Sequence, residues 1–462
     1  MTEQRYDVVI VGAGPAGIFA AVELVRSGRV QRILIAERGK PIAKRTCPAR
    51  QTHCIGCETC SIMTGWGGAG AFSDGKLTLS TQVGGRLGDY VSAHSMERLI
   101  EDADRVWLEF GATTEVHSPD ADAAARLMRK ATLADMRLIP MRIRHIGTER
   151  SPAVLQAMHD YLAGHGVEIR LSSGVSRIVA DSGHVEGVEF ADGTSVKAPV
   201  VIAAPGRDGA DWLAEQAHAL GIGLVNNAVD IGVRVEVPAP VMEPLTKDLY
   251  EAKLIYYSKQ FGDQVRTFCM NPYGEVTTES YGDILTVNGH SFADERTANT
   301  NFAILVSQSF TQPFHEPITY GRSIAGLANL LGEGIIVQRL GDLRAGRRST
   351  EKRIAESVVV PTMPQATPGD LSFVLPYRHL VDILEFIEAL DDLAPGVAGD
   401  STLLYGVEVK FYSSRLELDH NLQSQVAGLY AIGDGAGVTR GLIQASASGL
   451  VAARAVLAGG VT

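Results

Sequence analysis

Hydrophobic positions near the start of the chain follow the order strand, turn, helix, strand. Residues 6–12 form a continuous β-branched run that ends in glycine, and residues 15–27 repeat apolar side chains at helical spacing. Residues 31–37 are again an apolar run of strand length. Together these segments span about thirty residues, the size of a parallel strand pair joined by a crossover helix. The pattern predicts an α/β fold that opens with a βαβ unit.

The later pattern divides the chain into three stretches. Alternating residues predict antiparallel strands at 166–171, 175–180 and 185–190, and a continuous apolar run predicts a buried strand at 200–204. From about residue 226 short β segments dominate, such as 229–237, 267–270 and 284–287, before residues 428–434 and 441–457 return to strand, loop and helix. We therefore predict one domain built from residues 1–225 and 407–462, with a mixed β-sheet (α+β) domain inserted at 226–406.

Composition and charge narrow the class of protein. The chain has 45% hydrophobic and 21% charged residues and a formal net charge of −11, which is typical of a soluble α/β protein and disfavours a nucleic-acid or anionic-membrane partner. Residues 8–25 approach the length of a membrane span, but glycine, proline and glutamate interrupt them. No signal peptide is recognisable, so we predict a cytoplasmic protein that does not bind membranes.

The first turn carries a dinucleotide-binding motif. Gly12, Gly14 and Gly17 fit the pattern GxGxxG, in which the glycines allow a tight turn, backbone approach to a pyrophosphate and close packing of helix on strand. The following helix would direct free N–H groups at the phosphates. Glu37 ends the next strand twenty residues after Gly17, where its carboxylate would accept hydrogen bonds from ribose hydroxyls.

The C-terminal motif distinguishes FAD from NAD. Residues 428–434 (GLYAIGD) resemble the second FAD motif of the glutathione-reductase-like flavoproteins. The resemblance implies a Rossmann domain built from both chain ends, in which Asp434 binds the ribityl chain and the helix after Gly441 points at the flavin. By the same resemblance, Val175 would meet adenine through its backbone, whereas Ala204-Pro205-Gly206-Arg207 replaces the usual Ala-Thr-Gly turn. The predicted FAD-binding residues are Gly12, Gly14, Pro15, Ala16, Gly17, Glu37, Arg38, Gly68, Val175, Gly206, Gly433, Asp434, Gly441, Leu442 and Ile443.

Longer strings narrow the resemblance to one family. Residues 67–76, 268–272, 287–291, 338–342 and 433–441 resemble the bacterial and archaeal FAD-dependent dehydrogenase family, which has its own C-terminal domain. The resemblance covers nearly the whole chain and implies flavin redox chemistry, but the family's substrates are largely unassigned. The sequence has no second GxGxxG in a βαβ unit, so electrons would come from a small-molecule substrate, a transiently bound NAD(P)H or an electron-transfer protein.

Four cysteines form a motif within a glycine- and cysteine-rich loop at 44–75. Cys47, Cys54, Cys57 and Cys60 have the spacing Cx6CxxCxxC, and four thiolates are ligands that iron–sulfur clusters and zinc both accept. The tight CxxCxxC run favours a [4Fe–4S] cluster over zinc, and a redox dithiol is a third interpretation. Cys269 has a strand-like apolar context and is expected to be a small buried hydrophobic residue.

The candidate catalytic residues are His290, Lys76 and Arg440, with Asn288 beside the first. Histidine could transfer a proton near neutral pH, and the cations could stabilise reduced flavin or a substrate carboxylate. The leading prediction is an FAD-dependent oxidoreductase that transfers hydride between a small organic substrate and flavin, with electrons relayed through the cysteine motif. An FAD-binding protein with structural zinc, or with a thiol redox switch that serves a sensor or partner-binding module, is the alternative.

Overall fold

The chain folds into two compact units. The computed structural model describes residues 4–48, 57–73, 75–249, 251–281, 284–291, 296–310, 314, 316–411 and 414–460. Unit 1 comprises Met1–Val116, Ile143–Asn227 and Tyr412–Thr462, and unit 2 comprises His117–Arg142 and Ala228–Phe411. The chain passes from unit 1 to unit 2 after Asn227 and returns after Phe411, within a few residues of the predicted boundaries at 226 and 406. Residues 117–142, however, group with unit 2 instead of with the N-terminal part.

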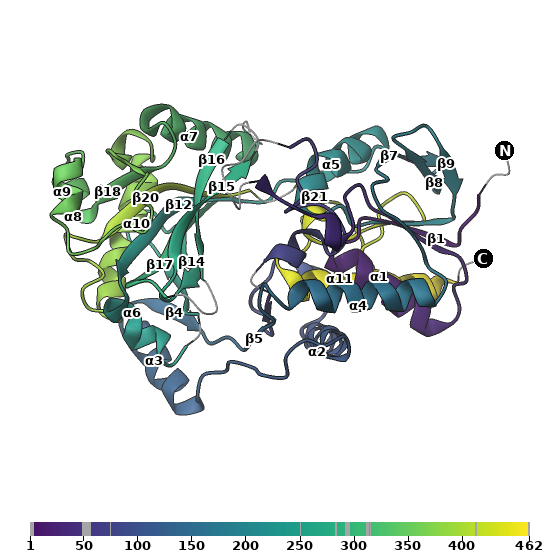
Figure 1. Cartoon of the computed structure of the whole chain (residues 1–462), viewed down its shortest axis with the longest axis horizontal. Helices are drawn as coiled ribbons and strands as arrows, with labels where there is room; N and C mark the ends of the chain where they lie inside the picture. Colours follow the sequence, from purple (N-terminus) through teal and green to yellow (C-terminus); the bar gives the residue numbers. More distant parts are fainter. Residues whose placement is uncertain are drawn as a thin grey trace. The chain divides into compact units, whose positions relative to one another are not determined.

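A five-stranded parallel sheet forms the centre of unit 1 (Figure 1). Its order is β22 (Leu429–Ala431), β10 (Val200–Ala203), β1 (Val8–Val11), β2 (Ile33–Ala36) and β6 (Glu168–Arg170). Every residue of β1 and β2 is buried, as expected for parallel strands that are covered on both faces. The C-terminal strand β22 pairs with β10, which in turn pairs with β1, so both chain ends contribute to one sheet.

Two helices from opposite ends of the chain pack side by side on this sheet (Figure 1). They are α1 (Pro15–Ser27) and α11 (Leu442–Gly459), and Gly449 permits their close approach because a Cβ there would lie 2.2 Å from the Ala16 carbonyl oxygen. Among the described helices, only α11 is long and apolar enough to cross a membrane, but 67% of that stretch is buried, as in a core helix. The other helices of unit 1 are α2 (Ala93–Glu109), α4 (Ser151–Gly164) and α5 (Ala210–Ala219).

One predicted strand pairing is wrong. Residues 166–171 were expected to join an antiparallel group, but β6 pairs in parallel with β2, because helix α4 precedes it and returns the chain to the same edge of the sheet. The antiparallel group contains only β7 (Val175–Asp181), β8 (His184–Phe190) and β9 (Ser195–Lys197). Two short pairs complete unit 1, β3 (Lys76–Thr78) with β5 (Ile143–His145) and β11 (Leu224–Val225) with β21 (Arg415–Leu416).

Unit 2 is built on an eight-stranded mixed sheet. Its order is β19 (Thr367–Pro368), β18 (Ile336–Arg339), β20 (Leu403–Lys410), β12 (Val229–Pro238), β17 (Asn299–Gln308), β14 (Gln264–Asn271), β13 (Lys253–Tyr257) and β4 (Met136–Ile139). Only the β18–β19 pair is parallel. A hairpin of β15 (Glu275–Tyr281) and β16 (Ile284–His290) lies beside the sheet. The helices are α3 (Ala121–Leu133), α6 (Ala239–Thr246), α7 (Pro317–Gly332), α8 (Leu340–Arg344), α9 (Glu351–Ala355) and α10 (Tyr377–Asp391).

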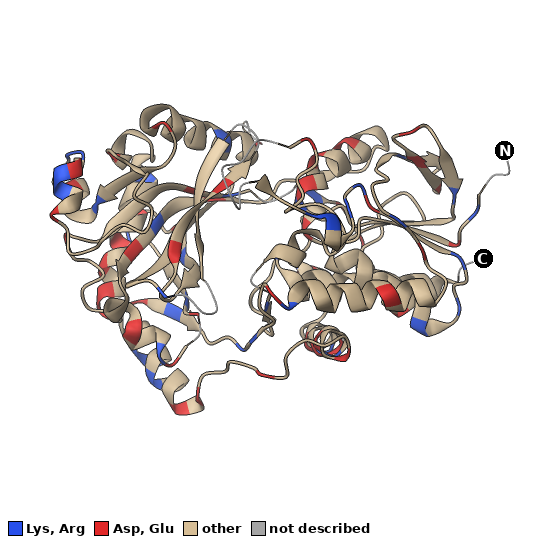
Figure 2. Ribbon diagram, in the orientation of Figure 1, with Lys and Arg blue, Asp and Glu red and all other residues tan. Residues whose placement is uncertain are grey.

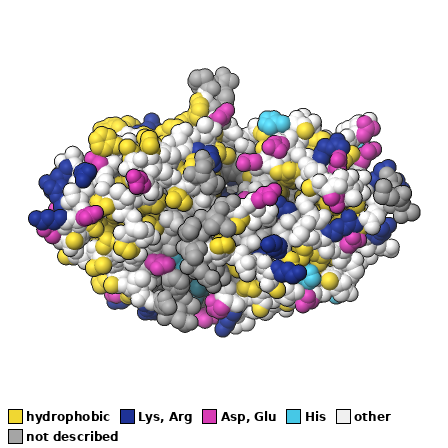
Figure 3. Space-filling view, turned by 45° about the horizontal axis from the view of Figure 1, so that its top comes forward, with side chains coloured by type: hydrophobic (Ala, Val, Ile, Leu, Met, Phe, Trp, Pro, Cys, Tyr) yellow, Lys and Arg dark blue, Asp and Glu magenta, His cyan; other side chains and the backbone are white. Residues whose placement is uncertain are grey.

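The two faces of this sheet differ in chemistry. Alternate residues of β12, such as Val233 and Val235, share an apolar core with Phe386 of α10. The intervening residues Asp230 and Arg234 are charged and yet buried. Figure 2 shows basic (blue) and acidic (red) residues on the strands of this sheet. The space-filling view in Figure 3 shows charges of both signs interspersed on one face of the molecule. The sheet therefore has an apolar face under α10 and a face with buried charges.

Helix α10 also buries two titratable side chains in the first turns of its inner face. His379 is 2% exposed and Asp382 is 0% exposed, and neither ring nitrogen of His379 has a hydrogen-bond partner among the described residues. Burial lowers the pKa of His379 to about 4 and raises the pKa of Asp382 to about 6. Burial therefore extends the pH range of each neutral form, which His379 keeps above about pH 4 and Asp382 keeps below about pH 6.

This burial predicts an unusual dependence of stability on pH. The pKa of Asp382 is higher in the folded chain than the ordinary 3.8, so protonation of its carboxyl group favours the folded state. This contribution to the free energy of unfolding is complete below pH 3.8 and is lost as the pH rises through about 6. Asp382→Asn should then raise the free energy of unfolding at pH 8 by about 1–3 kcal/mol, at roughly 1.4 kcal/mol per pKa unit, and should have little benefit at pH 4. Urea titrations at the two pH values measure this. Asp392→Asn, at the exposed residue that follows the same helix, is the control, and an equal effect at both pH values would contradict the prediction.

Candidate functional site

The glycine-rich turn of unit 1 joins β1 to α1 at the carboxyl end of the parallel sheet. Gly12 has φ +105°, and a Cβ there would lie 2.1 Å from the carbonyl oxygen of Ala204. A Cβ on Gly17 would lie 2.1 Å from the carbonyl oxygen of Gly12. At both positions a side chain would therefore clash with the protein's own backbone, whether or not a ligand is bound. At Gly14, by contrast, a Cβ would meet no described atom within 4 Å, which leaves space next to the first turn of α1, beginning at Pro15.

The Glu37 carboxylate lies beside this turn. It accepts hydrogen bonds from the backbone N–H of Ala13 at 2.9 Å, of Gly39 at 2.8 Å and of Gly65 at 3.0 Å. These contacts tie three loops to one buried carboxylate. Because a carboxylate offers about four lone-pair sites, Glu37 retains capacity to accept a further hydrogen bond from a ribose hydroxyl.

The C-terminal motif lies at the carboxyl end of β22. Gly433 adopts φ +78°, and its N–H donates to the Ser448 hydroxyl at 3.1 Å. The Asp434 carboxylate accepts from the Thr439 hydroxyl at 2.8 Å and from the Gly441 N–H at 3.3 Å. Burial raises the pKa of Asp434, while the charge of Arg207 and the Thr439 hydrogen bond oppose the rise. Gly441, with φ +88°, is the N-cap residue of α11, which begins at Leu442.

A segment that the sequence motifs missed pairs with this loop. The Arg86 N–H donates to the carbonyl of Val438 at 2.8 Å, and the Arg440 N–H donates to the carbonyl of Gly84 at 2.7 Å. A Cβ on Gly84 would lie 2.1 Å from Gln444 Cγ in the first turn of α11. The adjacent glycines at 84 and 85 were the signal in the sequence for an unusual backbone conformation here. In the structure both residues have positive φ.

The remaining predicted FAD-binding residues all belong to unit 1. Arg38 forms an ion pair with Asp208, and a Cβ on Gly68 would lie 3.1 Å from the Gly14 Cα. Gly206 has φ +68° and precedes a short 3-10 helix, and Val175 begins β7. Ala16 is buried at the start of α1, and Leu442 and Ile443 open α11.

The structure brings the two sequence motifs to the carboxyl ends of parallel strands in one sheet, where α/β proteins bind nucleotides.

The predicted metal ligands are only partly described. Cys47 and Cys60 are half-buried and Cys57 is exposed, all three as free thiols, whereas Cys54 lies outside the described residues. Within the described part of the chain, no three His, Cys, Asp or Glu side chains form a group that could hold a metal ion. Because Cys54 lies outside the described residues, the three described thiols alone do not test the predicted centre, so no chemical step is derived through one and the metal stays a prediction.

The predicted catalytic residues belong to different units. Lys76 begins β3 opposite His145, and Arg440 lies in the loop before α11, both in unit 1. His290 ends β16 in unit 2, opposite Glu275 on β15. Their catalytic roles stay predictions.

Unit 2 contains a buried charge network on the polar side of its sheet. Arg234, which is fully buried, donates to both carboxylate oxygens of Glu408 at 2.7 and 2.8 Å and to the Asn301 Oδ1 at 2.8 Å. Lys410 contacts Glu279 at 2.8 Å and Glu408 at 3.3 Å. Burial alone would lower the pKa of Lys410, but the two carboxylates raise it above its ordinary value. Lys410 therefore stays charged despite its burial.

The expectation for Cys269 is wrong. The residue is half-buried, has φ +44°, and sits at a register irregularity between β14 and β17. Its carbonyl oxygen accepts a hydrogen bond from Arg234 Nη1 at 3.0 Å. The apolar sequence around Cys269 predicted burial, but the bulge turns this residue out of the alternating pattern and toward the charge network.

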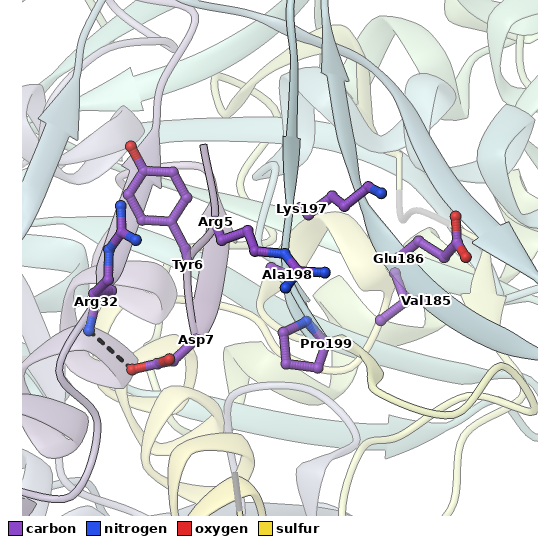
Figure 4. A pocket seen from close by; sticks show the side chains of 9 residues that line it. All are labelled: Arg5, Tyr6, Asp7, Arg32, Val185, Glu186, Lys197, Ala198 and Pro199. Atoms are coloured by element: carbon purple, nitrogen blue, oxygen red, sulfur yellow. Dashed lines mark hydrogen bonds between the residues drawn. The ribbon is translucent and has the colours of Figure 1, made fainter. Parts of the chain in front are cut away.

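A surface pocket of about 450 Å³ in unit 1 lies away from the glycine-rich turn (Figure 4). It is lined by Arg5, Tyr6, Asp7, Arg32, Val185, Glu186, Lys197, Ala198 and Pro199. Tyr6 and Asp7 precede β1 and Pro199 precedes β10, so the pocket lies at the amino ends of these parallel strands. The dashed line in Figure 4 marks the Arg32 N–H donating to Asp7, which orders this rim. Because ligands of such sheets bind at the carboxyl ends, we assign the pocket no part in the nucleotide site.

The residues present fit FAD. The space at Gly14 and the positive dipole end of α1 suit a pyrophosphate, and the Glu37 carboxylate suits a ribose. The backbone turn at Gly433 and the Asp434 carboxylate are suited to a polyhydroxyl chain.

Comparison with known proteins agrees with this fit. Residues 7–220 match the family model described as FAD dependent oxidoreductase, and residues 228–411 match the model described as FAD-dependent protein, C-terminal domain-like. An uncharacterised protein of Clostridium beijerinckii is 28% identical over 479 residues, which cover 97% of this chain and 80% of that protein.

Solved structures resemble the chain more distantly. The 3-ketosteroid-Δ4-(5α)-dehydrogenase of Rhodococcus jostii RHA1 is 13% identical, with a TM-score of 0.45 and coverage of 98% of this chain and 97% of that one. The L-proline dehydrogenase of P. horikoshii is 11% identical, with a TM-score of 0.40 and coverage of 99% and 95%. Because the two family models together span most of the chain and both describe FAD-dependent proteins, the chain is an FAD-dependent oxidoreductase.

Proposed function

We propose that unit 1 binds FAD as a glutathione-reductase-like Rossmann domain and that unit 2 supplies groups that recognise a small organic substrate. The observation that carries the FAD assignment is the convergence of both motifs at the carboxyl ends of β1 and β22. Asn288, which is half-buried and accepts from Arg234 of the buried charge network at 3.5 Å, supports the substrate assignment, because a ligand site carries a few placed polar groups that fix the ligand's orientation.

When bound, the flavin accepts or supplies a hydride at its ring system. The chain's own residues position it: the first turn of α1 directs N–H groups at the pyrophosphate, and Asp434 accepts from ribityl hydroxyls. The N-terminus of α11, beginning after Gly441, directs its positive dipole end at the flavin and so stabilises negative charge there. In this proposal Lys76 and Arg440 supply positive charge, and His290 moves a proton.

A direct experiment tests the redox function. The purified protein is screened anaerobically with amino acids, hydroxy acids, NADH and NADPH, and bleaching of the oxidised flavin absorbance is recorded. We expect at least one class of small molecule to bleach or restore that absorbance, which also identifies the electron donor. A protein that binds FAD in equal amount but exchanges no electrons with any donor, including dithionite-reduced mediators, would contradict the proposal.

The cysteine motif receives a separate proposal. We infer that Cys47, Cys54, Cys57 and Cys60 hold a [4Fe–4S] cluster, on the basis of their spacing alone. Iron and acid-labile sulfide analysis of anaerobically purified protein, with EPR after reduction, tests this. Zinc in place of iron would favour a structural metal, and neither metal with a reversible dithiol titration would favour a redox switch.

A further inference from the structure

Arg45 is a buried arginine that organises the loop after the cysteines. The residue is 4% exposed. Its guanidinium donates to four backbone carbonyls, those of Ser61 at 2.9 Å, Ile62 at 2.8 Å, Trp66 at 2.7 Å and Gly68 at 2.9 Å. It also lies 4.7 Å from the centre of the Phe72 ring. Five N–H donors in one rigid plane suit this arrangement, which a lysine ammonium could not reproduce.

The loop that Arg45 organises touches the phosphate-binding turn. The Gly67 N–H donates to the carbonyl of Ala13 at 2.8 Å, and Gly68 packs against Gly14 so closely that a Cβ on Gly68 would lie 3.1 Å from the Gly14 Cα. Gly65 adopts φ +123°, and a Cβ there would lie 2.7 Å from the Cδ of Arg45. The Arg45 side chain therefore packs against the loop at Gly65. The same loop contacts Gly14 through Gly68.

The other end of the same loop carries cysteines. The carbonyl of Cys60 accepts the N–H groups of Met63 at 3.1 Å and Thr64 at 2.9 Å, so the turn begins at this cysteine. Ser61, which Arg45 holds through its carbonyl, is the next residue. Burial lowers the pKa of Arg45 to about 10, and the negative charge of Glu37 opposes that shift.

We propose that Arg45 is a positioning residue through which the segment bearing Cys57 and Cys60 supports the phosphate-binding turn, so that a bulky group attached to Cys60 weakens FAD binding. The inference rests on the FAD binding by unit 1 proposed above. Its physical basis is an unbroken series of contacts. Cys60 begins the turn, and Arg45 binds four backbone carbonyls of the loop that follows. Gly67 and Gly68 of that loop contact Ala13 and Gly14.

The first test compares two buried arginines. FAD affinity is measured by titrating apoprotein with FAD and following the quenching of flavin fluorescence. Arg45→Met and Arg45→Lys should each raise the Kd for FAD at least about tenfold, the loss expected from about 1.4 kcal/mol of lost positioning. Arg144→Met is the matched control in unit 1, because Arg144 is also 4% exposed and donates to Asp104 and to the carbonyl of Thr113, away from the glycine turn. Thermal melting of each apoprotein separates folding defects from weaker binding.

The second test places a group on a single thiol. One variant retains only Cys60 and a matched variant retains only Cys57, which is exposed, with the other cysteines changed to serine. After reaction with N-ethylmaleimide, the Cys60 variant should bind FAD about fivefold or more weakly, and the Cys57 variant should change less than about twofold, a difference of roughly 1 kcal/mol. In the Arg45→Met background the effect of labelling Cys60 should disappear.

Two results would overturn the inference: Arg45→Met that binds FAD as tightly as Arg144→Met, or equal effects of labelling Cys57 and Cys60. If the unmodified protein bound no FAD at all, the proposed cofactor site would be wrong instead.

Discussion

Gly14→Val should abolish FAD binding while the apoprotein remains folded. A Cβ at residue 14 would meet no described protein atom within 4 Å, and the φ of −80° and ψ of 177° at this residue suit valine. The valine would instead occupy the space into which we place the pyrophosphate. Loss of glycine at the N-cap of α1 should cost about 1 kcal/mol or less. The Kd for FAD and the free energy of unfolding of the apoprotein are therefore expected to separate.

Gly17→Val is the contrasting variant. Its Cβ would lie 2.1 Å from the carbonyl oxygen of Gly12 and 3.1 Å from a methyl group of Ile10, so β1 and α1 could not pack as they do. We expect little folded protein, visible as loss of a cooperative melting transition. The proposed pyrophosphate position would be wrong if Gly14→Val retained stoichiometric FAD, or if both variants unfolded alike.

Breaking the buried ion pair in unit 2 should have the largest effect on stability. Arg234 and Glu408 are each 0% exposed and are joined by two hydrogen bonds. Removing one partner leaves an uncompensated buried charge, which costs about 3–5 kcal/mol. Glu408→Gln should be the more damaging single change, because it leaves both Arg234 and Lys410 without that carboxylate. Urea titrations of the single variants Arg234→Met and Glu408→Gln measure these losses.

The double variant Arg234→Met/Glu408→Leu distinguishes charge from packing. Replacing both charges by apolar groups of similar volume removes the desolvation cost as well as the attraction, so much of the lost stability should return. Arg126→Met, which breaks an exposed ion pair with Asp248, is the control and should cost less than about 1 kcal/mol. Single variants of the buried pair that are as stable as this control would contradict the prediction.

The sequence itself determined the nucleotide site of unit 1 to a large extent. Strand β1, helix α1 and strand β2 form where the apolar pattern predicted them, because local spacing and the glycines of the turn decide those elements. The space at Gly14, and the crowding at Gly12 and Gly17, correspond to the separate roles that the motif assigns to its three glycines.

The pairing of distant segments was decided only by the tertiary structure. The alternation at residues 168–170 did not reveal whether β6 lies parallel or antiparallel to its neighbour, because both patterns alternate and the preceding helix sets the direction. The same holds for residues 117–142, since the apolar pattern of β4 does not identify β13 of unit 2 as its partner.

Tertiary structure likewise decided which polar residues are buried and what holds them. Arg45 reads in the sequence as one more basic residue in a polar loop, yet four backbone carbonyls separated along the chain converge on it. Arg234, Glu408 and Asn301 come from three strands, so no local spacing could place them together. Short-range pattern fixes secondary structure and turns, whereas the compensation of buried charge depends on contacts between residues far apart in the chain.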